Sequence, residues 1–322
     1  MFKKAGSLSL VLLALVWLCN CAAQPTEIEN SQVTSSGHQA NRVTIAVTRD
    51  FGRELVLQKE VEVQDDTSAL KALMAVASVE TKYGGGFVSA INGISSEYSV
   101  AGGKKRDWFF YVNGIASKVG ASDFILRPGD IEQWDFRDWS YHHFVPAIVG
   151  SYPKPFLSDY NAGTVIVYED GFASDAEALR ASLKNEGVSR ISCLQYDRLP
   201  PEDKQMANLI IIAGEENDLI AELNRMHKKL GFYAYLQTGR IVILDAAGNP
   251  AGEYGAGSSL IQATQNPWNP KGIGAAANVV WMVTGTDASG IKRAADILIN
   301  RAKELRHACA IVATRDGVIK VP

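Results

Sequence analysis

The sequence has few cysteines and no excess of either charge. Four cysteines in 322 residues are too few for a disulfide framework. Lysine and arginine together number 32 against 35 aspartates and glutamates, so no global positive field favours nucleic acid. No apolar run reaches the ~20 residues of a membrane-spanning helix. With 47% hydrophobic and 21% charged residues, the chain is expected to form about two globular domains.

Catalytic and metal-binding motifs are also missing. The patterns GxSxG, HExxH and Walker A do not occur. His142 and His143 are adjacent and would point to opposite faces of a strand, so we expect no zinc site. Cys193 and Cys309 lie in apolar runs, where a cysteine is usually buried and inert. Whether these two form a disulfide is left open, and the chain is predicted not to be an enzyme.

The N-terminus has the pattern of an export signal. Lys3 and Lys4 precede an apolar run over residues 8–18. That run is too short for a membrane span but typical of a signal peptide. We therefore predict a signal peptide over residues 1–20 and an exported protein.

A lipid anchor is predicted directly after this signal. Cys21 follows the apolar run in a context that resembles the bacterial lipobox, in which the cysteine carries a lipid. Ordinary cleavage near residues 22–23 is the alternative. Residues 21–41 are polar and lack apolar periodicity, which indicates a flexible tether. The expected location is the cell surface, held to the cell membrane by the lipid.

The first domain is predicted from strand periodicity around a single helix. Apolar residues alternate over 43–47 and 55–63, which favours a hairpin. An N-cap cluster at 65–68 then precedes helical spacing. Short strands are expected around residues 87–91, 107–112 and 131–136. This order predicts an α+β, β-grasp-like domain over residues 42–140.

The second domain is predicted from alternating strands and helices. Residues 141–162 contain three prolines among aromatic residues and are expected to be a linker. From residue 163 to 322, apolar runs alternate with amphipathic segments, which predicts an α/β domain with a mostly parallel sheet. Strands are expected at 164–168, 190–196, 209–213, 240–244 and 278–284, and helices at 174–185, 218–230, 258–264 and 288–305.

Two turns of this domain have features of ligand-binding turns. Gly255-Ala256-Gly257 precedes the predicted helix 258–264, whose amides would face an anion. Because the third glycine of the dinucleotide fingerprint is missing, a structural turn is the preferred interpretation. Gly285-Thr286-Asp287 ends a predicted strand, where open α/β sheets bind ligands. Asp287 is interpreted first as a helix N-cap.

Aromatic residues concentrate between residues 108 and 144. Alternate residues of a strand face opposite ways, so Trp108 and Phe110 are expected on one face and Phe109 and Tyr111 on the other. Exposed rings beside polar groups suit a large amphipathic ligand or an interface. Packing between the two domains is the alternative.

An ordered series of motifs in the first domain resembles a known bacterial domain family. The series consists of Thr81-Lys82-Tyr83-Gly84-Gly85-Gly86-Phe87, Ile91-Asn92-Gly93-Ile94, Asp107-Trp108-Phe109-Phe110-Tyr111-Val112-Asn113-Gly114, Gly120, Leu126, Pro128-Gly129-Asp130, Trp134 and Phe136. This family is similar to the C-terminal β-domain of transcobalamin and intrinsic factor, the animal cobalamin carriers. The resemblance covers about residues 42–140 and implies a β-grasp-like fold and a corrinoid ligand.

The resemblance also implies ligand-binding residues. In the carriers, a glycine–aromatic turn and a strand that begins with tryptophan approach the corrin. The corresponding residues here are Gly85, Gly86, Phe87 and Trp108, and Phe109 stands where the carriers have a polar residue. Asn92 and Tyr111 add an amide and a ring on neighbouring elements. The carriers close their site with a large helical domain, which this chain lacks.

The second half shows a weaker resemblance. Three segments are similar to a repeat domain of prokaryotic surface-layer-associated proteins. They are Asn266-Pro267-Trp268-Asn269-Pro270, the run 279–284 and Gly285-Thr286-Asp287-Ala288-Ser289-Gly290. The resemblance implies a cell-surface setting and no chemistry.

These observations predict a cell-surface lipoprotein that binds a small-molecule ligand for uptake. The leading ligand is a corrinoid such as cobalamin, handed on to a membrane importer. No metal site, covalent cofactor or nucleic-acid partner is expected. The alternative is a structural or adhesive module of the cell envelope that binds a protein or polymer, and an enzyme with a site hidden in the α/β sheet is a third possibility.

Overall fold

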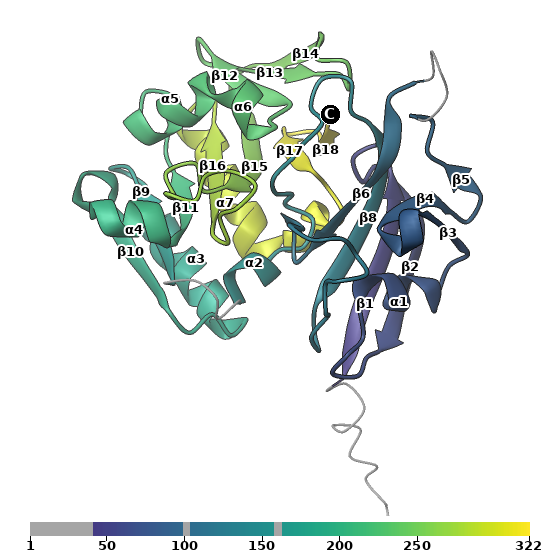
Figure 1. Ribbon diagram of the computed structural model, residues 1–322. Coiled ribbons are helices and arrows are strands. Elements are labelled where there is room, and N and C mark those ends of the chain that lie inside the picture. The colour runs from purple at the N-terminus through teal and green to yellow at the C-terminus, as the bar shows by residue number, and fades with distance from the viewer. Residues whose placement is uncertain (1–40, 99–103, 158–162) are drawn as a thin grey trace, which may run out of the picture. The chain divides into compact units, whose positions relative to one another are not determined.

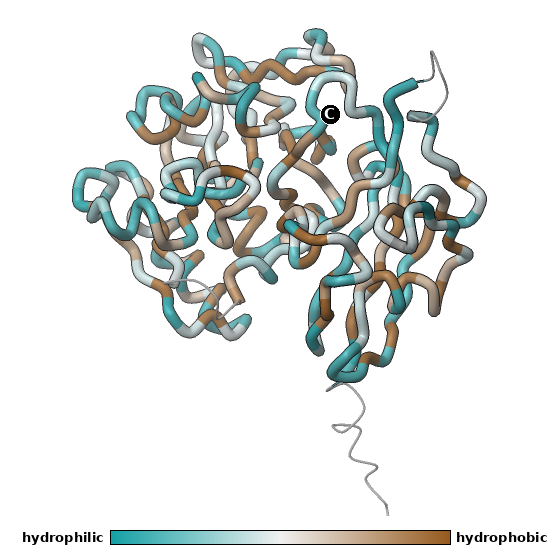
Figure 2. Tube along the Cα trace, viewed as in Figure 1, coloured by the Kyte–Doolittle hydropathy of each residue, from teal (hydrophilic) through white to brown (hydrophobic). Residues whose placement is uncertain are grey.

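The computed structural model describes residues 41–98, 104–157 and 163–322 (Figure 1). The predicted signal peptide, the lipid site at Cys21 and all of the tether except residue 41 lie outside these residues. Within the described ranges, no helix combines the length and the apolar character needed to cross a membrane. Hydrophobic residues, brown in Figure 2, concentrate along the strands, and hydrophilic residues along the outer loops.

The first half of the chain is built on a five-stranded mixed sheet. Its order is β2-β1-β8-β6-β7, with β1 (Arg42–Arg49) and β8 (Ile131–Asp138) parallel at its centre. The other strands are antiparallel to their neighbours: β2 (Glu54–Glu62), β6 (Arg106–Val112) and β7 (Ile115–Ala116). The α+β character is as predicted, whereas the β-grasp class stays a prediction.

One face of this sheet is covered by a helix and a small second sheet. Helix α1 (Ala69–Met74) begins where the Ser68 hydroxyl accepts a hydrogen bond from the Lys71 N–H at 3.2 Å, which confirms the predicted N-cap. The small sheet consists of β3 (Val79–Lys82), β4 (Phe87–Ile91) and β5 (Ile94–Ser95). Together they bury Val43, Ile45, Leu73, Ile91, Trp108, Trp134 and Phe136 in one core.

The second half is built on a seven-stranded sheet. Its order is β10-β9-β11-β16-β15-β17-β18. The first four strands are parallel: β10 (Ile191–Gln195), β9 (Thr164–Tyr168), β11 (Asn208–Ile212) and β16 (Val279–Gly285). The last three are antiparallel to their neighbours: β15 (Ser259–Gln265), β17 (Ala310–Ala313) and β18 (Val318–Val321). The sheet is therefore mixed, and the expectation of a mostly parallel sheet is not confirmed.

Both faces of this sheet are covered, as the near-continuous apolar runs predicted. Helices α3 (Ala173–Asn185) and α7 (Ala288–Asn300) pack on one face, over Ile166, Ile210 and Trp281. The other face packs against helices α5 (Asp218–Arg225) and α6 (His227–Leu230). The same face also contacts a three-stranded sheet of β12 (Ala234–Gln237), β13 (Arg240–Leu244) and β14 (Pro250–Tyr254).

One predicted helix is wrong. Residues 258–264 were expected to be helical, but the segment forms strand β15, all seven residues of which are buried. Leu260 packs on one face of the sheet, and Ile261 and Ala263 pack on the other. Because β16 and β17 pair with it on both sides, tertiary pairing overrides the local pattern. The predicted helix 218–230 is divided at Met226, and the helix predicted to reach residue 305 ends at Asn300.

The predicted linker carries buried, long-range contacts. Val145, Ile148 and Val149 are at most 2% exposed. The Ile148 N–H donates to the Gly114 carbonyl at 2.8 Å, and the Val149 N–H donates to the Cys309 carbonyl at 3.1 Å. The described residues belong to one compact unit. The proposed domain boundaries stay a prediction, but the residues between the two sheets contact both of them.

A buried guanidinium lies where the two sheets meet. Arg137 of β8 is 1% exposed. Its Nη1 lies 3.7 Å from Oδ2 of Asp135, and its Nη2 donates to the Tyr111 hydroxyl at 2.6 Å. The guanidinium also lies over the rings of Phe51 and Phe109, at 5.4 and 4.2 Å from their centroids. We call Arg137, Asp135, Tyr111, Phe51 and Phe109 the junction cluster.

Backbone of the second half approaches this cluster closely. Gly52 adopts a positive φ of 80°, and a Cβ there would lie 1.8 Å from the His307 carbonyl oxygen. Only glycine fits both constraints. The Lys320 amine donates to the Gly52 carbonyl at 2.5 Å, and the Gln133 amide donates to the His307 carbonyl at 2.9 Å.

A buried carboxyl group lies on the opposite face of β8. Glu132 is fully buried, and its Oε1 accepts a hydrogen bond from the Trp134 indole at 2.5 Å. Its Oε2 has no hydrogen-bond partner among the described residues. Burial raises the pKa of Glu132 from 4.5 to about 8. The carboxyl is therefore protonated in the folded protein at neutral pH.

This raised pKa predicts a pH-dependent stability. Because the pKa of Glu132 is higher in the folded state than in the unfolded state, folding takes up a proton between about pH 4.5 and 8, and stability falls as pH rises through that interval. Glu132→Gln keeps an acceptor for Trp134 and removes the ionisation. We expect the variant to exceed the native protein in stability at pH 9 by an amount on the order of a few kcal/mol.

The measurement is urea denaturation at pH 5, 7 and 9. Glu62→Gln, at an exposed position of β2, is the matched control and should leave the pH profile of stability unchanged. Equal profiles for the native protein and Glu132→Gln would show that Glu132 is ionised in the fold.

Candidate ligand-binding site

The aromatic residues predicted to bind a ligand lie on opposite faces of β6. Trp108 is 7% exposed and Tyr111 is 1% exposed. The Trp108 indole donates to the Ile94 carbonyl at 2.9 Å, and its ring lies 5.1 Å from that of Phe136. The Tyr111 hydroxyl donates to the Val145 carbonyl at 3.1 Å. Neither ring offers an open face for stacking.

Phe109 lies on the same side as Tyr111, in the junction cluster. Its ring covers the Arg137 guanidinium and packs against the core of the second half. Packing between the two halves, the alternative raised from the sequence, therefore accounts for this face. On the other face Phe110 stacks on Trp134 with centroids 5.0 Å apart.

The remaining predicted residues lie in turns. Gly85 and Gly86 end a short 3₁₀ turn, and Phe87 begins β4, half-buried, with its ring 6.4 Å from that of Tyr83. Asn92 is exposed, and its side-chain oxygen accepts the Ser78 N–H at 2.9 Å. The structure does not bring the seven predicted residues together on one surface, and their role in binding stays a prediction.

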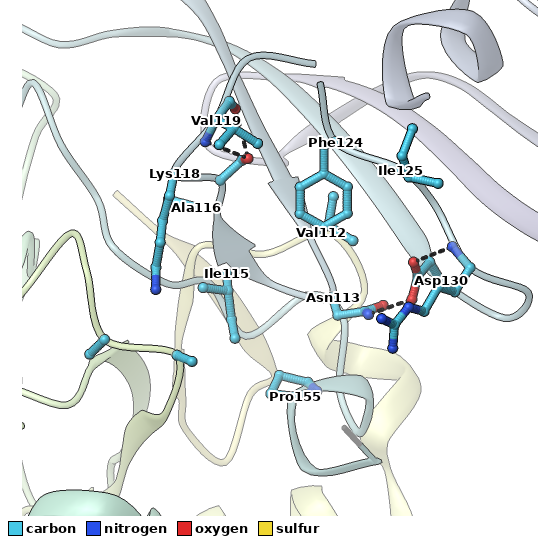
Figure 3. A pocket seen from close by; sticks show the side chains of 14 residues that line it. Val112, Asn113, Ile115, Ala116, Lys118, Val119, Phe124, Ile125, Asp130 and Pro155 are labelled. Carbon is cyan, nitrogen blue, oxygen red and sulfur yellow. Dashed lines mark hydrogen bonds between the residues drawn. The ribbon is translucent and has the colours of Figure 1, made fainter. Parts of the chain in front are cut away.

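A cavity of about 390 Å³ lies instead at the other end of β6 (Figure 3). Its volume is within the range of small-molecule sites, roughly 300–1,000 Å³. The residues that line it are Val112, Asn113, Ile115, Ala116, Ser117, Lys118, Val119, Phe124, Ile125, Arg127, Asp130, Pro155, Ala276 and Ala277. Both halves of the chain contribute to this cavity.

Most of the lining is apolar. Val112 closes the cavity from the end of β6, and Ile115 and Phe124 project from the segments that follow (Figure 3). Val119 and Ile125 are 49% and 44% exposed. A ligand that enters the cavity would remove these two side chains from water, which favours binding.

Hydrogen bonds hold the walls of the cavity in place. The Asn113 amide donates to Asp130 Oδ1 at 2.7 Å, and the Arg127 N–H donates to Asp130 Oδ2 at 2.8 Å. The Ser117 hydroxyl donates to the Val119 carbonyl at 2.8 Å. The loop between residues 117 and 130 is thus largely pre-formed, which limits the entropy lost on binding.

A lysine, Lys118, lies at the edge of the cavity. The Lys118 amine donates to the Ala275 carbonyl, which precedes the lining residues Ala276 and Ala277. Partial burial, and secondarily the charge of Lys271, lower the pKa of Lys118. Lys118 therefore lies close to a second basic side chain, that of Lys271.

The glycine-rich turn of the second half is structural, as preferred from the sequence. The Gly257 N–H donates to Asp287 Oδ2 at 2.7 Å, and the Ser258 N–H donates to the Thr286 hydroxyl at 3.1 Å. Asp287 Oδ1 also accepts the Gly290 N–H at 2.9 Å and so caps α7, as predicted. The amides that would face an anion are already bonded.

The asparagines of the 266–270 motif also have structural partners. The Asn266 amide donates to the Lys204 carbonyl at 2.8 Å, and the Asn269 amide donates to Asn278, whose own amide donates to the Ala207 carbonyl at 2.7 Å. These carbonyls belong to the end of α4 (Pro201–Met206) and the residue after it. The motif thus satisfies backbone acceptors at a helix C-terminus.

Both cysteines of the folded body are free thiols. Cys193 is half-buried and Cys309 is buried, and burial raises the pKa of each to about 12. In the ranges that the structure describes, no three His, Cys, Asp or Glu side chains are placed to hold a metal ion.

The burial of Trp108 predicts a large stability loss on truncation. Trp108→Ala leaves a cavity beside Phe136 and removes the hydrogen bond to the Ile94 carbonyl, so we expect a loss of about 3–5 kcal/mol. Tyr83→Ala is the control: Tyr83 is 88% exposed and its removal should cost under about 0.5 kcal/mol. Chemical denaturation measures both, and a loss below about 1 kcal/mol for Trp108→Ala would contradict its place in the core.

Comparison with known proteins locates one related domain. A family model for a domain of unknown function (DUF4430) matches residues 66–138. No curated protein matches the chain. A candidate metal-binding protein from Ruminococcus gnavus is 16% identical with a TM-score of 0.24, over 30% of this chain and 97% of that chain. Haptocorrin in complex with Cbi is 13% identical with a TM-score of 0.25, over 31% of this chain and 26% of that chain.

The family model matches residues of the first half of the chain. The resemblance of the second half to a surface-layer repeat domain stays a prediction. Residues 66–138 therefore match a domain of unknown function, and any ligand has to be argued from the residues of this chain.

Proposed function

We propose that this chain is an exported, lipid-anchored protein that binds a small amphipathic ligand without catalysing a reaction. The observation that supports binding is the 390 Å³ cavity, in which exposed apolar side chains lie beside a few polar groups. The polar lining residues Asn113, Ser117 and Asp130 form hydrogen bonds within the walls of the cavity, and none of these bonds pairs a nucleophile with a base.

A corrinoid is the first ligand to test. This proposal rests on the motifs of residues 42–140 that resemble the cobalamin carriers. The cavity lies near the lower end of the size range for ligand sites, so a macrocycle would insert one edge. The rest of the ring would lie over the exposed Val119 and Ile125. Surface attachment would place such a ligand next to a membrane importer.

A charge in the mouth of the cavity should weaken binding. The full chain is incubated with cobalamin and desalted, and the retained corrin absorption band is measured. Val119→Asp places a carboxylate against the ligand, and we expect the affinity to fall at least tenfold. Leu55→Asp is the matched control, because Leu55 of β2 is equally exposed, at 49%, and does not line the cavity.

The outcomes of this experiment are distinct. A native protein that retains no band would overturn the corrinoid proposal. A band that Val119→Asp leaves unchanged would place the corrinoid outside this cavity.

The anchoring part of the proposal has its own test. In this proposal a lipid on Cys21 holds the mature protein to the membrane, so Cys21→Ala should move it from the membrane fraction to the soluble fraction. Immunoblots of fractionated cells measure the ratio. Equal membrane retention of the native protein and the variant would contradict lipidation.

A further inference from the structure

We infer that the ligand of the cavity is an amphipathic anion, an apolar chain that ends in a carboxylate. This inference rests on the proposed binding of a small amphipathic ligand, and it names a ligand class other than the corrinoid for the same cavity. It follows from the charged groups around the cavity, which are Lys118, Arg127 and Asp130. Two of these three are cations.

The acidic group of the cavity is already bonded. Both oxygens of Asp130 accept hydrogen bonds, from the Asn113 amide at 2.7 Å and from the Arg127 N–H at 2.8 Å. The Asp130 carboxylate thus holds the wall of the cavity. The Asp130 carboxylate therefore has less capacity to bind a cationic group of a ligand than a carboxylate without such hydrogen bonds would have.

The Lys118 amine, unlike the Asp130 carboxylate, keeps hydrogen-bonding capacity for a ligand. Among the residues that the structure describes, Lys118 forms no ion pair, and its hydrogen bond goes to a backbone carbonyl, that of Ala275. An ammonium group has three donors, so two remain for another acceptor. The nearby Lys271 adds positive charge and no counter-ion. A ligand carboxylate would supply the missing negative charge.

The geometry separates this cationic edge from the apolar body of the cavity. Lys118 and Asp130 lie on opposite sides, with Ile115 between them and Val112 and Phe124 above it (Figure 3). A carboxylate at Lys118 would therefore place its chain against Ile115, Val112 and Phe124. A head group in this position also leaves the exposed Val119 and Ile125 for the chain to cover.

The test is a calorimetric titration of the full chain at pH 7.5 with three probes of equal chain length. These are decanoate, 1-decanol and decyltrimethylammonium, all below their aggregation limits. We expect decanoate to bind at least tenfold more tightly than decanol, and the cation to bind most weakly. Within a series from octanoate to dodecanoate, affinity should rise by up to about fourfold for each methylene that the cavity buries.

Lys118→Gln assigns the effect to one residue. It should weaken decanoate binding about tenfold and leave decanol binding unchanged, because only the anion gains from the charge. Lys229→Gln, on helix α6 and away from the cavity, is the matched control and should change neither affinity. Thermal melts verify that both variants are folded.

The failures of the two proposals are distinguishable. Equal affinity for decanoate and decanol, with no effect of Lys118→Gln, would overturn the anionic ligand and leave a neutral ligand in the cavity. If none of the three probes binds and cobalamin is not retained, the proposed binding function itself fails. If decanoate binds equally well to Val119→Asp, the anion binds at another place on the surface.

Discussion

The buried guanidinium of Arg137 is the constraint on which the arrangement of the two sheets depends. A charge taken out of water is costly unless it is paired and hydrogen-bonded. Asp135 and Tyr111 supply the pair and the hydrogen bond, and both belong to the first sheet. The water-excluding wall comes partly from the second half: the Phe51 ring lies 4.9 Å from that of Tyr233, and Cys309 packs in the same core. The favourable environment of Arg137 therefore requires both halves of the chain.

The cavity is a consequence of the same junction. Its main wall follows β6 and the loop to Asp130, but Pro155, Ala276 and Ala277 close it from the other half. The hydrogen bonds of Ile148 and Val149 hold the connecting segment to Gly114 and Cys309. A change that loosened the junction would alter the width of the cavity without touching a lining residue.

The sequence predicts those parts of the fold that depend on local pattern. Alternation over 43–47 and the Ser68 cap identify β1 and α1, and the apolar runs identify β9, β11 and β16. The sequence does not predict elements whose structure depends on pairing with distant segments. An example is β15, which is a strand because β16 and β17 form hydrogen bonds with it. Trp108 and Phe109 are adjacent and equally aromatic, and the partners that bury them are distant in sequence. Many of the cavity residues lie in the loop between residues 117 and 130, which lacks periodicity, and the apolar Val119 beside Lys118 is the one local sign of the cavity.

The position of β1 bears on how the protein withstands force. It is the first strand of the described chain, and it has hydrogen-bonded ladders on both sides, antiparallel with β2 and parallel with β8. If Cys21 is anchored, any pull between membrane and protein enters at Arg42 and acts along the strand. Both ladders then bear the load together in shear, and they do not open one bond at a time as an edge hairpin would. An anchor at Cys21 would thus load β1 where two hydrogen-bonded ladders resist its extraction.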